Sequence, residues 1–392
     1  MAIPKLINEA KTNNKKLFLQ FGGQGSPYLK ELTKIYKDEP ELKEFFDKTF
    51  ETLNKLEKNN GGKSNRFISE GLDLKSWMEN ENSVPSEDYQ MRGCISIPLI
   101  FIVQMANYLS FVQKGYSVSE LLAQTAGLTG HSQGVISATI ASMGKEGQDF
   151  YEVYSNFIDY MFYIGLRAQE EYPNFDVSED VVKQVTDLGD KNPAPMVACI
   201  GYATEELEAK VQEINKENNL TGKHTIYASL YNASNSIVLS AEPSSLVLFR
   251  KKFKAEMDAK KGKFVFLKTT VPFHSPLVAS SWTKFEQDLK ERINFKYTGS
   301  DLKRPVYSIH DGKNLQQVEN LGKELFDEMV IQTLHWDKAL TELFRNSEID
   351  TVIDFGPSVV SSKLTGGQLS DKKLEKRVVC VSNPKDLKHI YG

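Results

Sequence analysis

The pattern with the clearest chemical meaning is Gly130-His131-Ser132-Gln133-Gly134, which fits the G-x-S-x-G turn of a nucleophilic serine. Such a turn strains the serine backbone between a strand and a helix, and only a residue without a Cβ atom fits easily on either side. The run after it, Val-Ile-Ser-Ala-Thr-Ile-Ala-Ser-Met, predicts a helix whose first amides face developing negative charge. The same pentapeptide can form a turn with an idle serine, but its strand–turn–helix context favours a nucleophile at Ser132.

A serine hydroxyl is a poor nucleophile until a base removes its proton, so a histidine is expected nearby. Of the six histidines, His131 adjoins Ser132, and its side chain should diverge from the hydroxyl. His274 lies between Pro272 and Pro276, which fix the local backbone. We therefore expect His274 to be the base, with an ordinary surface or core histidine as the alternative.

The elements expected around these residues describe an α/β body with a small inserted unit. A buried strand over 17–21 ends in a glycine-rich turn, and a helix over 95–112 is apolar almost all round. Residues 174–195 are expected to form a polar connector. Residues 196–267 then predict strand, helix, strand, strand, helix and strand, an order typical of a ferredoxin-like unit, with 232–235 as its inner turn. Short strands over 306–308, 351–355 and 378–381 then continue the helix–strand alternation of the α/β body. The expected large subdomain therefore comprises 1–190 and 271–392, and the small one 191–270.

Composition excludes several classes of protein. The chain has 392 residues and a net charge of −4, so no overall basic field favours nucleic acid. The most apolar stretch, around 95–105, is interrupted by polar residues and falls short of a membrane span, and the first residues lack the apolar region of a secretory signal. Three scattered cysteines suit neither a disulfide framework nor a zinc site. We expect a cytoplasmic protein that binds no metal, membrane or nucleic acid.

Several motifs in one order resemble acyl-carrier-protein acyltransferases. They are residues 17–26 (LFLQFGGQGS), 130–134 (GHSQG), 229–240 (SLYNASNSIVLS), 272–276 (PFHSP) and 353–357 (IDFGP). The chain is most similar to the acetyltransferase domain of fungal-type fatty acid synthase and to the starter-unit acyltransferases of polyketide synthases. This resemblance extends over residues 17–381. It implies an α/β-hydrolase-like large subdomain with an inserted ferredoxin-like small one.

The resemblance also implies a ping-pong mechanism without a bound cofactor. Ser132 would attack an acyl-CoA thioester while His274 takes its proton, and the phosphopantetheine thiol of an acyl carrier protein would then remove the acyl group. The backbone amides of Gln24 and Gln133 would form the oxyanion hole. In this family a backbone carbonyl orients the histidine, and the matching position suggests the loop at residues 346–347. Asn232 would support the site.

The substrate pocket is expected to include His131, Ile164, Arg167, Asn232 and Phe273. Malonyl-specific relatives carry an arginine at the position of Ile164, and an apolar side chain there cannot compensate a buried carboxylate. The chain should therefore prefer a neutral short acyl group such as acetyl. Arg167, three residues on, lies on nearly the same helical face and is an alternative carboxylate or CoA ligand. Phe273 would limit the acyl length, or simply pack in the core.

Carrier proteins are typically acidic, so the basic residues between 250 and 263 are either a docking surface or a solvated helix face. Three other functions remain open. A serine thioesterase or esterase would need an acid between the serine and the histidine in sequence. An acyl hydrolase of the same fold would clear acyl groups from carrier proteins. A non-catalytic subunit would serve assembly alone. The sequence does not distinguish fatty acid from polyketide synthesis.

Overall fold

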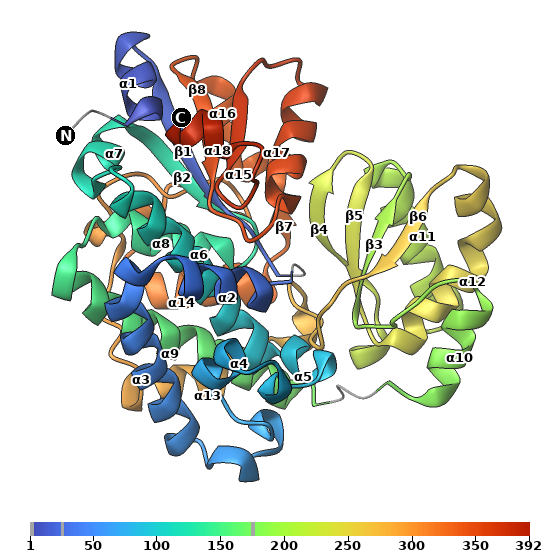
Figure 1. Ribbon diagram of the computed structural model, residues 1–392. Coiled ribbons are helices and arrows are strands. Elements are labelled where there is room, and N and C mark those ends of the chain that lie inside the picture. Colours follow the sequence, from blue (N-terminus) through green and yellow to red (C-terminus); the bar gives the residue numbers. More distant parts are fainter. Residues whose placement is uncertain (1–3, 25–26, 174–176) are drawn as a thin grey trace.

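A sheet of four parallel strands forms the centre of the larger of two lobes in this computed structural model, which describes residues 4–24, 27–173 and 177–392 (Figure 1). Gly25 and Ser26, the last residues of the first motif, and residues 174–176 of the expected connector lie outside this description. The strand order is β2 (Thr125–Gly130), β1 (Lys16–Phe21), β8 (Ile349–Asp354) and β9 (Arg377–Cys380). Phe21 pairs with Gly130, so the loops that follow β1 and β2 begin side by side.

A fifth segment continues this sheet beyond β2. Val306 forms a parallel bridge with Leu128, but the expected strand over 306–308 is reduced to single bridges. The reason is a turn, because the Ser308 amide donates to the carbonyl of Lys313 and the chain folds back.

Helices pack on both sides of the large sheet. The central helix, α6 (Gly93–Gln113), has the length and apolar composition of a membrane-crossing helix. However, 89% of its 18-residue apolar stretch is buried within the fold. This helix is therefore the buried core helix that the sequence predicts over residues 95–112. The nucleophile turn leads into α8 (Gly134–Met143), and α9 (Gly147–Glu171) lies against α6. The other helices of this lobe are α1 (Lys5–Thr12), α2 (Leu29–Asp38), α3 (Lys43–Asn59), α4 (Leu74–Glu79), α5 (Glu87–Met91), α7 (Val118–Gln124), α13 (Ser281–Glu291), α14 (Leu321–Phe326), α15 (Trp336–Ala339), α16 (Thr341–Arg345), α17 (Val360–Asp371) and α18 (Leu387–Tyr391).

The smaller lobe has the predicted ferredoxin-like order. Its elements are β3 (Met196–Ile200), α11 (Thr204–Glu217), β4 (Tyr227–Ala233), β5 (Ser236–Ser240), α12 (Pro243–Ala259) and β6 (Lys263–Phe266). The strands pair antiparallel in the order β6-β3-β5-β4, and α11 and α12 cover the side away from the larger lobe (Figure 1). A two-residue strand of the larger lobe, β7 (Leu334–His335), adds parallel to the edge of β4 and ties the lobes together.

Two expectations for the smaller lobe need correction. The polar segment before it contains a helix, α10 (Glu179–Asp187), which Ser178 caps and which buries Val185 in the small-lobe core. Its polar composition obscured the helical spacing of its few apolar residues. The inner turn is also shorter than expected. Because β4 runs on to Ala233, which pairs with Ser236, only residues 234–235 form the turn and Asn232 belongs to the strand.

Candidate active site

The turn between β2 and α8 holds Ser132 at a strained corner. Its φ is +52°, a left-handed conformation that is uncommon for a residue with a side chain. A Cβ atom on Gly130 would lie 2.0 Å from the carbonyl carbon of Gly134, and one on Gly134 would lie 2.4 Å from the carbonyl oxygen of Phe21. Backbone is the obstacle in both cases, so neither position has room for a side chain. The glycines have the steric role that the sequence predicted.

Ser132 and His274 meet across the site. The Ser132 Oγ lies 2.8 Å from Nε2 of His274, and Nδ1 of His274 lies 2.9 Å from the carbonyl oxygen of Gln332. Because Nδ1 must donate to this carbonyl, Nε2 is left unprotonated and accepts from the Ser132 hydroxyl. Burial lowers the pKa of His274 to about 4, so the ring is neutral and basic at physiological pH. The geometry suits proton transfer from serine to histidine.

The carbonyl that orients His274 is not in the expected loop at residues 346–347. That loop precedes β8 and lies at the amino end of the strand, whereas the Ser132 turn follows the carboxyl end of β2. Gln332 instead ends a π-helical turn, Asp327–Ile331. A backbone carbonyl leaves no signature in the side-chain pattern, so this contact could not be identified from the sequence.

The two glutamines expected at the oxyanion hole flank the nucleophile. Gln133 follows Ser132 at the start of α8, where helix amides have no acceptor within the helix, and its side chain donates to the carbonyl of Ile97 at 3.2 Å. Gln24 follows β1, and its side chain donates to the Ser96 hydroxyl at 2.6 Å. Both side chains are thus bound to α6, which fixes the main chain of the two turns beside the hydroxyl.

A cavity of about 310 Å³ between the lobes contains the hydroxyl of Ser132 and the ring of His274. Along β3, Met196, Ala198 and Ile200 face it, while the alternate residues pack in the small-lobe core. Of the sequence-predicted residues, Gln24, His131, Asn232 and Phe273 also line it. Among the described lining residues the only lysine or arginine is Lys268, whose ammonium pairs with Glu87. Ser132 and His274 therefore open onto a cavity whose walls are mainly apolar.

His131 and Asn232 connect the two lobes beside this cavity. Nε2 of His131 lies 2.7 Å from Oδ1 of Asn232, and the carbonyl of Asn232 accepts from the Gln368 side chain at 2.9 Å. Burial lowers the pKa of His131, which keeps the ring neutral. Asn232 thus supports the turn that carries Ser132, rather than contacting the ring of His274.

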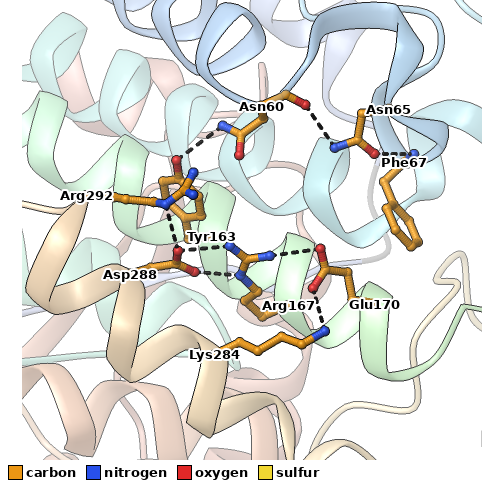
Figure 2. A network of polar contacts seen from close by, with 9 residues as sticks. All are labelled: Asn60, Asn65, Phe67, Tyr163, Arg167, Glu170, Lys284, Asp288 and Arg292. Atoms are coloured by element: carbon orange, nitrogen blue, oxygen red, sulfur yellow. Dashed lines mark hydrogen bonds and ion pairs between the residues drawn. The ribbon is translucent and has the colours of Figure 1, made fainter.

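Ile164 and Arg167 do not lie in the substrate cavity, contrary to expectation. Ile164 is completely buried in the large-lobe core. Nε and Nη2 of Arg167 donate to the two carboxylate oxygens of Asp288 on α13 at 2.6 and 2.9 Å, and Nη1 donates to Glu170 at 2.8 Å (Figure 2). The carboxylate of Asp288 raises the pKa of Arg167. This guanidinium is committed to a structural network away from Ser132.

The basic cluster of the smaller lobe is largely neutralised within that lobe. Arg250 pairs with Asp190 and Asp258, Lys252 with Glu213 and Glu217, and Lys260 with Glu206. The helix α12 that carries most of the cluster covers the face of the small sheet opposite the cavity. This arrangement fits the solvated-face interpretation better than a docking surface.

No group of three or more potential metal ligands (His, Cys, Asp or Glu) occurs among the residues that the structure describes.

The chain is similar in sequence to known proteins over most of its length. The family described as "Starter unit:ACP transacylase in aflatoxin biosynthesis" matches residues 19–274. The chain is 28% identical to fatty acid synthase subunit beta of Saccharomyces cerevisiae over 375 residues, which cover 91% of this chain and 18% of that protein. It is 27% identical to fatty acid synthase beta subunit aflB of Emericella nidulans over 374 residues, 90% of this chain and 17% of the relative. The chain thus spans less than a fifth of these relatives.

Solved structures share the fold over nearly the whole chain. A malonyl CoA-acyl carrier protein transacylase from Clostridium perfringens superposes with a TM-score of 0.65 at 20% identity, covering 95% of both chains. The malonyl-transacylase in a complex with a type II polyketide synthase acyl carrier protein gives a TM-score of 0.64 at 18% identity, with 96% of this chain and 99% of that chain covered. Together with the two sheets, these likenesses confirm the predicted fold class.

Proposed function

This chain belongs to the family of starter unit:ACP transacylases, and from that membership we propose that it moves a short neutral acyl group, acetyl first, from CoA to the phosphopantetheine thiol of an acyl carrier protein. The observation that carries the proposal is the 2.8 Å contact between Ser132 Oγ and His274 Nε2 inside an apolar cavity. The names of the relatives support a role in fatty acid or polyketide synthesis.

The first half-reaction would acylate the serine. His274 Nε2 takes the proton of Ser132 as Oγ attacks the thioester carbonyl, and the amides of Gln24 and Gln133 stabilise the oxyanion. When the tetrahedral intermediate collapses, the C–S bond breaks and the CoA sulfur leaves with the proton from His274. An ester on Ser132 remains.

The second half-reaction would reverse these proton movements with a new thiol. The phosphopantetheine thiol gives its proton to His274 as its sulfur attacks the ester carbonyl. The C–O bond to Ser132 then breaks, and Oγ recovers the proton from His274. The Gln332 carbonyl would hold the ring in one tautomer throughout, so that a carboxylate partner is not needed.

The preference for a neutral acyl group rests on the charges around the cavity. Among the described residues, a malonyl carboxylate buried there would meet no free cation, because Lys268 is paired with Glu87 and Arg167 is bound to Asp288. Burying an unpaired charge is costly, whereas an acetyl group meets apolar walls such as Phe273 and Leu230. Acyl-CoA and the carrier-protein arm would be substrates, and no bound cofactor takes part.

A cytoplasmic location is part of the proposal. The three cysteines are buried and unpaired, which suits a reducing compartment. The thioesterase alternative lacks support from the geometry, because Nδ1 of His274 contacts a carbonyl rather than the carboxylate that a Ser–acid–His triad requires.

Intact-mass analysis after incubation with acetyl-CoA or malonyl-CoA tests the proposal. We expect acetyl loading in the native protein, no loading of Ser132→Ala, and loss of the adduct when carrier protein with its phosphopantetheine arm is added. Preferential malonyl loading would overturn the neutral-acyl proposal. An acyl-enzyme that disappears equally fast without carrier protein would instead identify a hydrolase.

A further inference from the structure

The carbonyl that orients His274 belongs to an unusual backbone segment. The amide of Gln332 donates to the carbonyl of Asp327 at 2.7 Å and closes the π-helical turn Asp327–Ile331. The same turn contacts the histidine segment again, because the amide of Ser275 donates to the carbonyl of Val330 at 3.3 Å. Single π turns are uncommon and often occur at functional sites, so what holds this one in place matters for the site.

A buried carboxyl group, that of Glu328, links this turn to the neighbouring segment at Ile309. Glu328 is completely buried, and its Oε2 accepts from the backbone amide of Ile309 at 3.1 Å. The carbonyl of Ile309 in turn accepts from the amide of His335 at 2.7 Å. Ile309 is therefore tied to the chain on both sides of Gln332.

The anchor residue Ile309 belongs to the segment that runs beside β2. The amide of Leu128 in β2 donates to the carbonyl of Pro305, and the amide of Tyr307 donates to the carbonyl of Leu128, both at 2.9 Å. The strand β2 leads directly into the turn of Ser132. Hydrogen bonds therefore link the two halves of the site. On one side β2 carries Ser132 and pairs with the segment of Ile309. On the other side Glu328 joins Ile309 to the turn of Gln332, whose carbonyl orients His274 toward the Ser132 hydroxyl.

We propose that Glu328 is a positioning residue for the reaction, and that its acceptor oxygen holds the π-helical turn where the Gln332 carbonyl meets Nδ1 of His274. This inference rests on the proposed function of Ser132 and His274. A buried carboxyl is a costly acceptor for the Ile309 amide and the nearby Ser308 hydroxyl, and its Oε1 has no hydrogen-bond partner among the described residues. A role in the geometry of the base accounts for its presence.

The electrostatic surroundings of Glu328 bear on the test. Burial raises its pKa to about 7; hydrogen bonds from Ser308 and the Ile309 amide act against burial, and the charges of Glu324 and Asp311 act with it. Lys313 also faces it but is paired with Glu324 at 2.7 Å. Glu328 is thus a mixture of charged and neutral forms near neutral pH, and both forms keep an oxygen that can accept from Ile309.

The test compares Glu328→Leu, which removes the acceptor at similar size, with Glu328→Gln, which keeps an acceptor oxygen. The readouts are Ser132 acetylation by acetyl-CoA across pH and Ser132 labelling by a fluorophosphonate, a reagent that needs the serine–histidine pair but no acyl-CoA. Misplacing a catalytic group by about 1 Å can cost about 100-fold in rate, so we expect a loss of that order for Glu328→Leu in both reactions. Glu328→Gln should keep most of the rate.

The pH profile separates positioning from a merely structural role. The hydrogen bond to Gln332 raises the pKa of His274 against the effect of burial. If Glu328→Leu weakens this hydrogen bond, the acidic limb of the profile, where the acetylation rate falls as His274 becomes protonated, should move to lower pH. Glu328→Gln should leave the limb in place. Asp159→Leu is the matched control, because Asp159 is also a buried acid with a raised pKa of about 6 but lies on α9, away from the cavity.

Each result bears on the proposal. Native rates and an unmoved acidic limb in folded Glu328→Leu would overturn it. If Glu328→Leu does not fold, Glu328→Asp decides, since the shorter side chain withdraws the acceptor and native labelling of that variant would overturn the role. If the native protein is labelled by the fluorophosphonate but no acyl-CoA loads it, the proposed function fails while the labelling comparison still tests Glu328.

Discussion

His274 and Gln332 form a side-chain-to-backbone pair, with Nδ1 of the ring 2.9 Å from the carbonyl oxygen. The other ring nitrogen is 2.8 Å from the Ser132 hydroxyl, so a neutral acceptor takes the place that a carboxylate occupies in a triad. A carbonyl fixes the tautomer but adds no negative charge to stabilise the protonated ring. Burial lowers the pKa of His274 more than the hydrogen bond to this carbonyl raises it, so the ring is less basic than free histidine, and this property can be measured.

We expect the rate of Ser132 acetylation to be nearly constant across neutral pH and to fall only as the pH approaches 4. The pKa of His274 is lowered from 6.5 to about 4, chiefly by burial, and only the unprotonated ring can accept the serine proton. Activity is therefore lost as the pH falls through the lowered value. Quenched mass measurements of acetyl-enzyme at several pH values would show this, and an acidic limb centred near 6.5 would contradict it.

Gly130→Ala should prevent folding or strongly reduce stability, because its Cβ atom would lie 2.0 Å from backbone of Gly134. Gly367→Ala on α17 is the control, since no atom lies within 4 Å of a Cβ atom at that position. Alanine there should raise the free energy of unfolding by about 0.5–1 kcal/mol through helix propensity. Urea unfolding measures the free energy of unfolding of both variants. A Gly130→Ala protein of native stability would show that the turn can relax.

The sequence was sufficient to predict the Ser132 turn because three local signals coincide there: a buried strand, two glycines and an apolar helix. The ferredoxin-like order was equally accessible, since its strands and helices have distinct periodicities. Its inner and outer faces also follow from alternation along β3, where residues 196, 198 and 200 face the cavity.

The contacts that the sequence could not predict involve the backbone or distant partners. The Gln332 carbonyl and the π-helical turn have no side-chain signature, and β7 is too short to show a period. Arg167 was placed near the substrate because it shares a helical face with Ile164. Helical spacing cannot identify the opposing surface, and here that surface is Asp288 on α13.

Arg167→Ala should lower stability without changing the ratio of acetyl to malonyl loading. Among the described residues, the substitution leaves the buried Asp288 carboxylate with only the Arg292 guanidinium, 3.4 Å away, as an ion-pair partner. Removing one partner of a buried pair costs several kcal/mol, and with Arg292 still present we expect about 2 kcal/mol. Arg167→Lys should lose less, although lysine cannot reproduce the two-point contact. Unfolding curves measure the first effect and intact mass the second. A shift toward acetyl in folded Arg167→Ala would return Arg167 to the substrate site.

Charge reversal at Lys268 and at Lys251 tests whether an acidic carrier protein docks at the cavity or on the basic cluster of residues 250–263. Lys251 on α12 lies behind the small sheet and donates to Gln184, whereas Lys268 lines the cavity that the phosphopantetheine arm would enter in the proposed reaction. Lys268→Glu should therefore slow acyl transfer to the carrier severalfold at low salt, through repulsion at the mouth, and added salt should reduce the difference. Lys251→Glu makes the same change of charge and should leave transfer unchanged. Single-turnover transfer from preloaded acyl-enzyme measures both variants, and equal slowing by Lys251→Glu would restore α12 as a docking surface.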